Sequence, residues 1–231
     1  MPTLTYIGHS AFILDDGAGN VVAIDPFISG NPVSELDPKS VKVNTILLTH
    51  AHNDHVGDTV DLAKWNDAKV VTLVDLAGWL ETQGLSDVAG LNHGGTATFS
   101  GGTAKFFPAW HSSSYWDGEK HVAIGVPAGI VVRFGGATIY FAGDTALFSD
   151  MKLVGDEGID VAILPIGDYF TMGPADAARA AEFIGAKTVI PCHYNTFPPI
   201  RQDPEQFQAL VAERAPQSTV VILAPGESHD I

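Results

Sequence analysis

Short runs of β-branched and aromatic residues recur along the whole chain, and this pattern constrains the fold most. Most of the runs are bounded by Gly, Pro, Asn or Asp, so we interpret them as strands separated by turns. The runs are TLTYI, AFILDD, NVVAID, TILLTH, AKVVTL, TAKFFPA, GIVVRF, ATIYFAGD, DVAILPI, KTVIPCH and STVVILA. Some alternate with helical segments, whereas residues 1–25 and 103–142 contain strand patterns alone. That mixture predicts an α/β fold with more than one sheet and argues against a simple doubly wound parallel sheet.

Four segments between the strands have helical patterns. They are Val56 to Trp65, Leu73 to Gln83, residues 174–186 and the segment that starts at Asp203. The third has a proline in its first turn and a glycine near its end, which is the usual punctuation of a helix. In the fourth, Asp203 is a candidate N-cap and a proline follows it at the first helical position.

Length and composition indicate one compact domain over residues 1–231. A chain of 231 residues is long for one domain and short for two, and its 45% of hydrophobic residues is enough to build one large core. No run approaches the length of a membrane span, and the start MPTLTYIGHS lacks the features of a signal peptide. We therefore expect a soluble, cytoplasmic protein that does not bind a membrane.

The charge of the chain bears on its partners. Twelve Lys and Arg residues stand against 27 Asp and Glu residues, which gives a formal net charge of −15. Such a surface repels phosphate backbones, so we expect no nucleic acid partner and predict a small-molecule substrate instead. Association into a homo-oligomer stays open.

A dense cluster of potential metal ligands follows the run NTILL. The sequence THAHNDHVGD, residues 49–58, contains the pattern H-x-H-x-D-H, formed by His50, His52, Asp54 and His55. A loop that leaves a strand end lets neighbouring side chains converge, and imidazole with carboxylate suits zinc, iron or manganese. The alternative is a polar loop that is merely rich in histidine, and we favour a metal site because histidine is an uncommon residue.

Four ligands so close in sequence cannot easily bind one ion with good geometry, so a pair of metals about 3.5–4 Å apart would use them better. Further candidates follow apolar runs elsewhere: His111 in FPAWHSSS, Asp144 in YFAGDT and His193 in IPCHYN. Taken singly, either histidine could be a core residue. We nevertheless predict that all three project from strand ends into the same cleft.

The ordered set of H-x-H-x-D-H, a later His, Gly-Asp-Thr and a final His resembles the metallo-β-lactamase superfamily. The motifs cover residues 25 to 193. The resemblance implies a four-layer αββα sandwich, the metallo-β-lactamase fold, with metals at one edge of the sheets. The stretches YIGHSAF, IDPFISGNP, PIGDYFTMGP and PCHYNTFPPI extend it over nearly the whole chain, and they resemble small metal-dependent hydrolases related to ascorbate-6-phosphate lactonase.

The resemblance also implies a division of the ligands between two divalent ions, with Asp144 as the bridge. The first ion would be held by His50, His52 and His111, and the second by Asp54, His55 and His193. We expect Zn²⁺, with Mn²⁺, Fe²⁺ or Ni²⁺ as alternatives, because histidine and aspartate accept several first-row ions.

Two residues outside the main motifs receive roles from the same resemblance. Asp25 ends the run VVAID, and we predict that it orients a ligand histidine, with a turn or helix cap as the alternative. His9 would lie near the cleft and contact the substrate, so His9 and Asp54 are the candidate catalytic residues. A structural histidine with satisfied hydrogen bonds is the alternative for His9.

Other residues have weaker assignments. Asp168, in the loop after DVAILPI, and Tyr194, next to the last predicted ligand, are candidate substrate contacts, although turn chemistry explains Asp168 equally well. We expect Cys192, the only cysteine, to be buried and to point away from the site. Three histidines outside the motifs are expected in surface or loop positions: His93, His121 and His229.

These observations predict a metal-dependent hydrolase. Two ions sharing Asp144 would also share a hydroxide, because coordination lowers the pKa of water from 15.7 toward about 7. The hydroxide would attack a small ester, lactone, thioester or amide, and Asp54 would accept a proton. The alternatives are a small-molecule phosphodiesterase and an iron-dependent redox protein. Against the latter, His52 stands where the superfamily's diiron oxygen reductases usually have glutamate.

Overall fold

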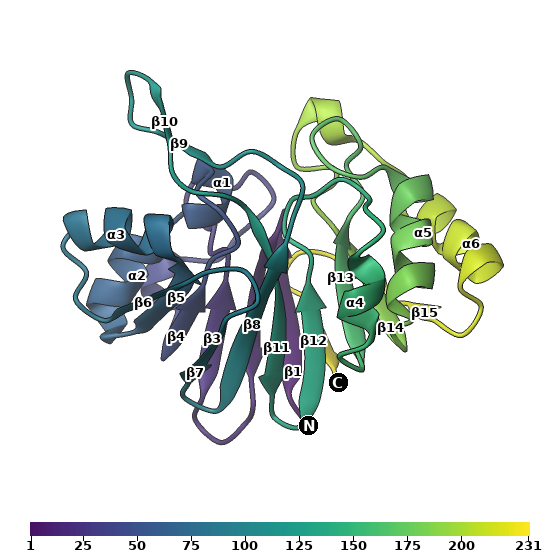
Figure 1. Cartoon of the computed structure of the whole chain (residues 1–231), viewed down its shortest axis with the longest axis horizontal. Helices are drawn as coiled ribbons and strands as arrows, with labels where there is room; N and C mark the ends of the chain where they lie inside the picture. Colours follow the sequence, from purple (N-terminus) through teal and green to yellow (C-terminus); the bar gives the residue numbers. More distant parts are fainter.

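The computed structural model describes all 231 residues, and most of its strands form two large sheets that lie face to face (Figure 1). In spatial order, the first sheet contains β16 (Ser228–Asp230), β1 (Thr3–Gly8), β2 (Ala11–Asp15), β3 (Val21–Ile24), β4 (Thr45–Leu47), β5 (Lys69–Leu73) and β6 (Val88–Leu91). The second contains β15 (Thr219–Val220), β14 (Thr188–Cys192), β13 (Val161–Pro165), β12 (Ala137–Phe141), β11 (Ala128–Phe134), β8 (Gly102–Pro108) and β7 (Thr96–Phe99). A separate hairpin is formed by β9 (Ser114–Trp116) and β10 (His121–Ala123).

Helices cover the outer faces of both sheets (Figure 1). The first sheet is covered by α2 (Thr59–Asn66) and α3 (Val74–Thr82), and the second by α4 (Met151–Gly155), α5 (Pro174–Ile184) and α6 (Pro204–Arg214). The short helix α1 (Asn53–Val56) lies at the edge, and two 3₁₀ turns span Pro38–Ser40 and Pro198–Ile200. None of the helices is long and apolar enough to cross a bilayer.

Three buried apolar clusters separate these layers. The largest lies between the two sheets and includes Phe12 and Leu47 from one sheet and Phe106 and Ile139 from the other. The other two clusters lie between each sheet and its own helices. Because burying one large aliphatic or aromatic side chain contributes about 1.5–3 kcal/mol, these clusters dominate the stability of the fold. The predicted four-layer sandwich is confirmed.

The pairing of the strands brings several strand ends to one edge. Strands β3 to β6 are parallel to one another, as are β12 to β15. Strand β1 is antiparallel to β2, which is antiparallel to β3, so β1 and β3 run the same way. By the same reasoning β8 runs parallel to β12. The segments after β1, β3, β4, β8, β12 and β14 therefore leave their sheets at the same edge.

One predicted helix is wrong in its bounds. The predicted helix from Val56 to Trp65 is interrupted at once, because Val56 ends α1 and α2 starts only at Thr59. Gly57 lies at the break, with a φ of 44° in the left-handed region. A Cβ atom at this position would lie 2.6 Å from the Cα atom of Phe27, so only glycine fits where the two loops meet. The helix that begins after Asp203 is confirmed, and the Asp203 side chain accepts a hydrogen bond from the Glu205 amide as predicted.

Candidate metal centre

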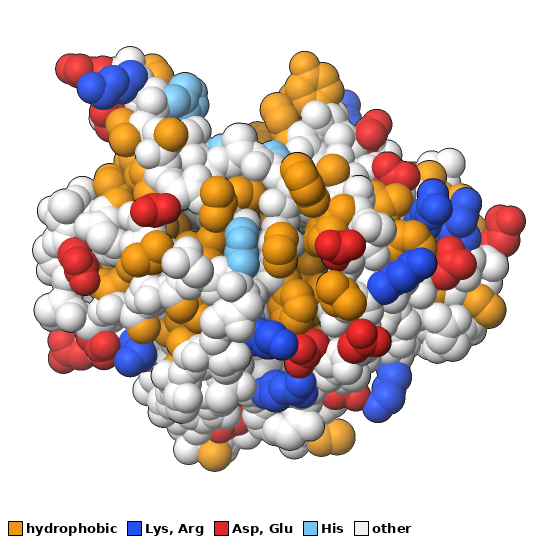
Figure 2. Space-filling model, in the orientation of Figure 1, with side chains coloured by type: hydrophobic (Ala, Val, Ile, Leu, Met, Phe, Trp, Pro, Cys, Tyr) orange, Lys and Arg blue, Asp and Glu red, His pale blue; other side chains and the backbone are white.

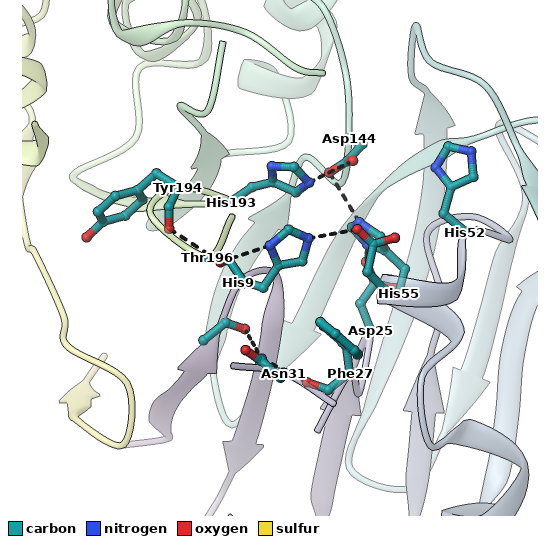
Figure 3. A network of polar contacts seen from close by, with 12 residues as sticks. His9, Asp25, Phe27, Asn31, His52, His55, Asp144, His193, Tyr194 and Thr196 are labelled. Carbon is teal, nitrogen blue, oxygen red and sulfur yellow. Dashed lines mark hydrogen bonds and ion pairs between the residues drawn. The ribbon is translucent and has the colours of Figure 1, made fainter. Parts of the chain in front are cut away.

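The structure brings the seven predicted ligands together at the shared strand edge. Four of them are labelled in Figure 3: His52, His55, Asp144 and His193. The seven ligands are divided between two groups in which the ligand atoms all lie within 4.8 Å of one another, and a third such group joins Asp25 to His50 and His55. One group consists of His50, His52, His111 and Asp144, and the other of His9, Asp54, His55 and His193. The two groups match the predicted division, except that the second gains His9.

Asp144 lies where the two groups meet. Its Oδ2 atom is 3.5 Å from Nε2 of His111, in the first group, and 3.1 Å from Nε2 of His193, in the second. Its Oδ1 atom is 3.4 Å from Nε2 of His55. Figure 3 shows His55 and His193 directed toward this carboxylate. A single buried carboxylate therefore faces both sets of histidines.

The residues at this edge fit metal cations. Both Nε2 of His55 and Oδ1 of Asp144 are buried, and apart from the 3.4 Å contact between them neither atom has a hydrogen-bond partner. Leaving such atoms unsatisfied costs about 1–3 kcal/mol each, more when they are charged. A cation between them would accept both lone pairs, and neutral imidazole with carboxylate is a donor set that zinc and related ions prefer.

Asp25 fixes the orientation of His55. This aspartate is 1% exposed, and its Oδ2 atom accepts hydrogen bonds from Nδ1 of His55 at 2.7 Å and from the Thr49 hydroxyl at 2.6 Å. Its Oδ1 atom accepts one from the Thr49 amide at 2.8 Å. Because the carboxylate can only accept, His55 carries its proton on Nδ1 and directs Nε2 at Asp144.

Thr49 transmits the same constraint to His50. Its hydroxyl proton points at Asp25, so its oxygen must accept the proton of His50 Nδ1, which lies 3.0 Å away. The Nε2 atom of His50 thereby keeps its lone pair directed into the site, where it lies 2.9 Å from Nδ1 of His52 and accepts the proton of that nitrogen. Asp25 thus sets the tautomers of two candidate ligands, His50 and His55. These contacts support the orienting role that was predicted for Asp25 from the sequence.

Burial keeps several of the histidines neutral. It lowers the pKa of His50 well below its usual value, lowers that of His111, and together with the charge of His111 lowers the pKa of His52 to about 4. Burial acts in the opposite direction on Asp144, but the charges of His193 and His55 outweigh it and hold the pKa of Asp144 well below normal. Neutral imidazole and ionised carboxylate are the forms that bind metals.

His55 differs from the other histidines. Burial lowers its pKa, yet the charges of Asp144 and Asp25 outweigh burial and raise the pKa of His55 well above 6.5. In the metal-free protein the imidazole therefore holds a second proton between two carboxylates. Binding of a cation at Nε2 displaces that proton.

His9 lies behind the site and does not reach its cleft. It is fully buried, its Nε2 atom lies 3.1 Å from Oδ2 of Asp54, and its Nδ1 atom lies 3.1 Å from Oγ1 of Thr196 (Figure 3). Because a carboxylate can only accept, Nε2 donates to Asp54 and Nδ1 accepts from the Thr196 hydroxyl. The expected direct contact of His9 with substrate therefore has no support from this geometry. Thr196 lies in the stretch PCHYNTFPPI, but no role was predicted for it from the sequence.

The backbone around these residues is constrained. His9, Asp25 and His193 have φ values of 60°, 44° and 53°, a left-handed region that costs a non-glycine residue about 1–2 kcal/mol. The His193 amide donates to the His9 carbonyl at 2.7 Å, which links the two sheets at this edge. Strain of this kind is typical of functional sites.

A cleft of about 400 Å³ opens onto the candidate ligands. Besides His52, Asp54, His111, Asp144 and His193, its lining comprises Ser112, Ser114, His121 and Phe170. Neither Asp168 nor Tyr194 lines it, and the Tyr194 side chain points away from the histidines (Figure 3).

The three histidines expected in surface or loop positions are not buried: His93 lies in a turn, and the other two lie in peripheral strands. His121 belongs to β10, where it lines the cleft, and His229 belongs to the edge strand β16. Cys192 is buried as predicted.

Comparison with known proteins agrees with this geometry. Residues 20–194 match the family model of the β-lactamase superfamily domain. A UPF0173 metal-dependent hydrolase of Geobacillus thermodenitrificans is 51% identical over 230 residues, 99% of each chain, and one of Thermus thermophilus is 50% identical over 227 residues, 98% of each chain. Among solved structures, Igni18, a metallo hydrolase of Ignicoccus hospitalis, has a TM-score of 0.87 and 36% identity, and the match covers 100% of this chain and 99% of that one.

The two hydrolases match this chain along almost its whole length, and the solved structure has the same layered fold. The narrower resemblance to ascorbate-6-phosphate lactonase stays a prediction. Fold, site and relatives agree that the chain belongs to the metallo-β-lactamase superfamily, in which it is a metal-dependent hydrolase.

Proposed function

We propose that the site holds two divalent cations, Zn²⁺ by preference, and hydrolyses a small ester, lactone, thioester or amide. The observation that carries the proposal is the position of Asp144, whose two oxygens face histidines of both groups at 3.1–3.5 Å. His50, His52 and His111 would hold the first cation, and Asp54, His55 and His193 the second, with Asp144 shared. Bound there, the cations would supply an activated hydroxide and polarise the scissile carbonyl.

Asp54 is the residue that moves a proton in this proposal. Its side chain is 34% exposed and lines the cleft, so it can reach the reacting group. Burial raises its pKa, but the hydrogen bond from His9 and the charge of His55 outweigh burial and lower it, which keeps Asp54 ionised and ready to accept a proton.

His9 acts through Asp54 as a positioning residue. Its Nε2–H group is donated to the carboxylate, so this nitrogen has no lone pair for a metal, and Thr196 fixes the ring from the other side. Burial, assisted by the charge of His193, lowers the pKa of His9 to about 4. The ring therefore stays neutral and keeps this hydrogen-bond pattern at neutral pH.

Metal analysis and a substrate screen test the proposal together. Elemental analysis of metal-replete protein should find close to two transition-metal ions per chain, and carbonyl substrates should be turned over. A reproducible content of one ion, with no gain on adding metal, would remove the bridging role of Asp144. Turnover of phosphodiesters alone would replace the reaction by the phosphodiesterase alternative, and oxygen-dependent turnover by the iron alternative.

A further inference from the structure

The lining of the cleft contains no lysine and no arginine. Its acidic members are Asp54 and Asp144, both assigned to the metal centre, and the chain as a whole carries a net charge of −15. The hairpin between β9 and β10 has one cation in its turn, Lys120, which is accompanied there by Asp117 and Glu119. A phosphate or carboxylate on the substrate would therefore find no lysine or arginine partner in this cleft, and away from the metal cations themselves it would lack a counter-ion.

Exposed aromatic side chains gather at the same edge. Five aromatic residues are more than 40% exposed, and four of them belong to the segments beside the cleft: Trp110, Trp116, Tyr169 and Phe170. Trp110 directly precedes His111, and the Trp116 ring lies 5.0 Å from that of His121. Such concentration on one side of a molecule marks a binding surface, whereas single exposed aromatics do not.

Phe170 is the aromatic residue that enters the cleft itself. It is 52% exposed, lines the cleft, and packs edge-on against Tyr169 with 4.8 Å between the ring centroids. Figure 2 shows the molecule hollowed at this edge, between the β9–β10 hairpin and a projection tipped with hydrophobic side chains. Ser112, Ser114 and His121 supply polar groups to the lining, so Phe170 is its only apolar contact.

We propose that the substrate is an uncharged molecule whose apolar group packs on Phe170 while its scissile group faces the metal ligands. This inference rests on the hydrolytic function proposed above and names the class of substrate for that site. An acidic group at the same place would lose hydration without gaining a partner. Each methylene buried against Phe170 gains about fourfold in affinity at full burial.

A matched pair of hydroxamates tests the inference without turnover. Both 4-methylpentanohydroxamate and the monohydroxamate of succinic acid have the same metal-binding head, and a carboxylate in one replaces an isopropyl group in the other. Calorimetry on zinc-replete protein should show that the apolar compound binds at least about tenfold more tightly. Phe170→Ala should reduce this ratio threefold or more and leave zinc content unchanged. Trp65→Ala removes an exposed aromatic of α2, outside the cleft, and should leave the ratio intact.

Three results would overturn the inference. The first is equal or tighter binding of the succinic acid monohydroxamate, the second is an affinity ratio that Phe170→Ala does not change, and the third is a failure of both compounds to bind. Turnover of p-nitrophenyl 4-methylpentanoate is measured in parallel. Hydrolysis without a preference between the hydroxamates leaves the proposed function standing and removes the inference. The preference without hydrolysis of any carbonyl substrate does the reverse: it supports the apolar subsite and removes the proposed reaction.

Discussion

Replacing Asp25 by Asn removes the acceptor that sets two histidine tautomers. Oδ2 of Asp25 accepts from both His55 Nδ1 and the Thr49 hydroxyl, at 2.7 and 2.6 Å. If the Asn carbonyl keeps the bond to the Thr49 amide, its NH₂ group meets two donors. If the amide flips, it faces the Thr49 amide instead. At least one hydrogen bond to a charged acceptor is lost in either case, each worth about 1.5–3 kcal/mol.

We expect the Asp25→Asn protein to bind zinc about 10–100-fold more weakly, because residues that orient ligands contribute on that scale. The metal-free protein should lose about 3 kcal/mol of unfolding free energy, which a domain of ordinary stability survives. Zinc affinity is measured by chelator competition, and stability by urea unfolding.

Asp160→Asn is the matched control. Asp160 accepts from the Thr138 amide and from Lys187 at the opposite end of the sheet, and it contacts no candidate ligand. Its replacement should leave zinc affinity unchanged. If Asp25→Asn retains wild-type zinc affinity within twofold, the chain from Asp25 through Thr49 to His50 does not orient the ligands.

Asp144→Asn should retain about one metal ion, remain folded and lose hydrolysis by about 10² or more, because a bridging charge between two cations is removed; two tightly bound metals with near-normal turnover would contradict the bridge. In the metal-free protein, the unfolding free energy should fall as the pH drops from 6.5 to 4. In this range the unfolded chain binds protons at His9 and His52, whereas in the folded protein their pKa values of about 4 keep both residues neutral. The unfolding free energy should also fall above pH 6.5, because His55 keeps a proton in the folded protein that it has lost in the unfolded state. Urea midpoints of the wild type and of His9→Gln, measured across pH 4–9, check both changes. The decrease on the acid side should be smaller in the variant. Gly57→Ala should lower the unfolding free energy by several kcal/mol in the same assay, because the new Cβ atom meets the Phe27 backbone. Gly78→Ala in α3, with open space around it, should not lower it. Equal effects of the two substitutions would contradict this explanation of the helix break.

The clustering of the candidate ligands could be predicted from the sequence because they follow apolar runs, and parallel strands bring such positions to the same edge. His50 and Asp144 are 94 residues apart, yet each is marked by its own local pattern. Some strands were not predicted because they lack a long β-branched or aromatic run. They are β6, with the sequence VAGL, and the three-residue strands β9 and β10. The expectation of a single domain stays a prediction.

The supporting contacts of Thr49 and Thr196 could not be predicted from sequence patterns. Thr196 contacts His9, from which it is separated by 187 residues in the sequence, and no local sequence feature predicts that its hydroxyl lies there. The role of Thr49 depends on the direction of one proton, which is decided by the carboxylate of Asp25. Sequence patterns identified the groups that can bind metal, whereas the contacts that orient them depend on how distant loops meet.

The β9–β10 hairpin has a consequence for how relatives of this chain can diverge. Its base is fastened twice: Asn53, next to Asp54, exchanges two hydrogen bonds with the Trp116 backbone, and the Tyr115 ring lies 4.5 Å from that of Trp79. Its turn, Asp117 to Lys120, is exposed and belongs to neither large sheet. Insertions, deletions and recombination can therefore remodel the mouth of the cleft while the ligands stay in place, so new substrates can be acquired during evolution without refolding the catalytic edge.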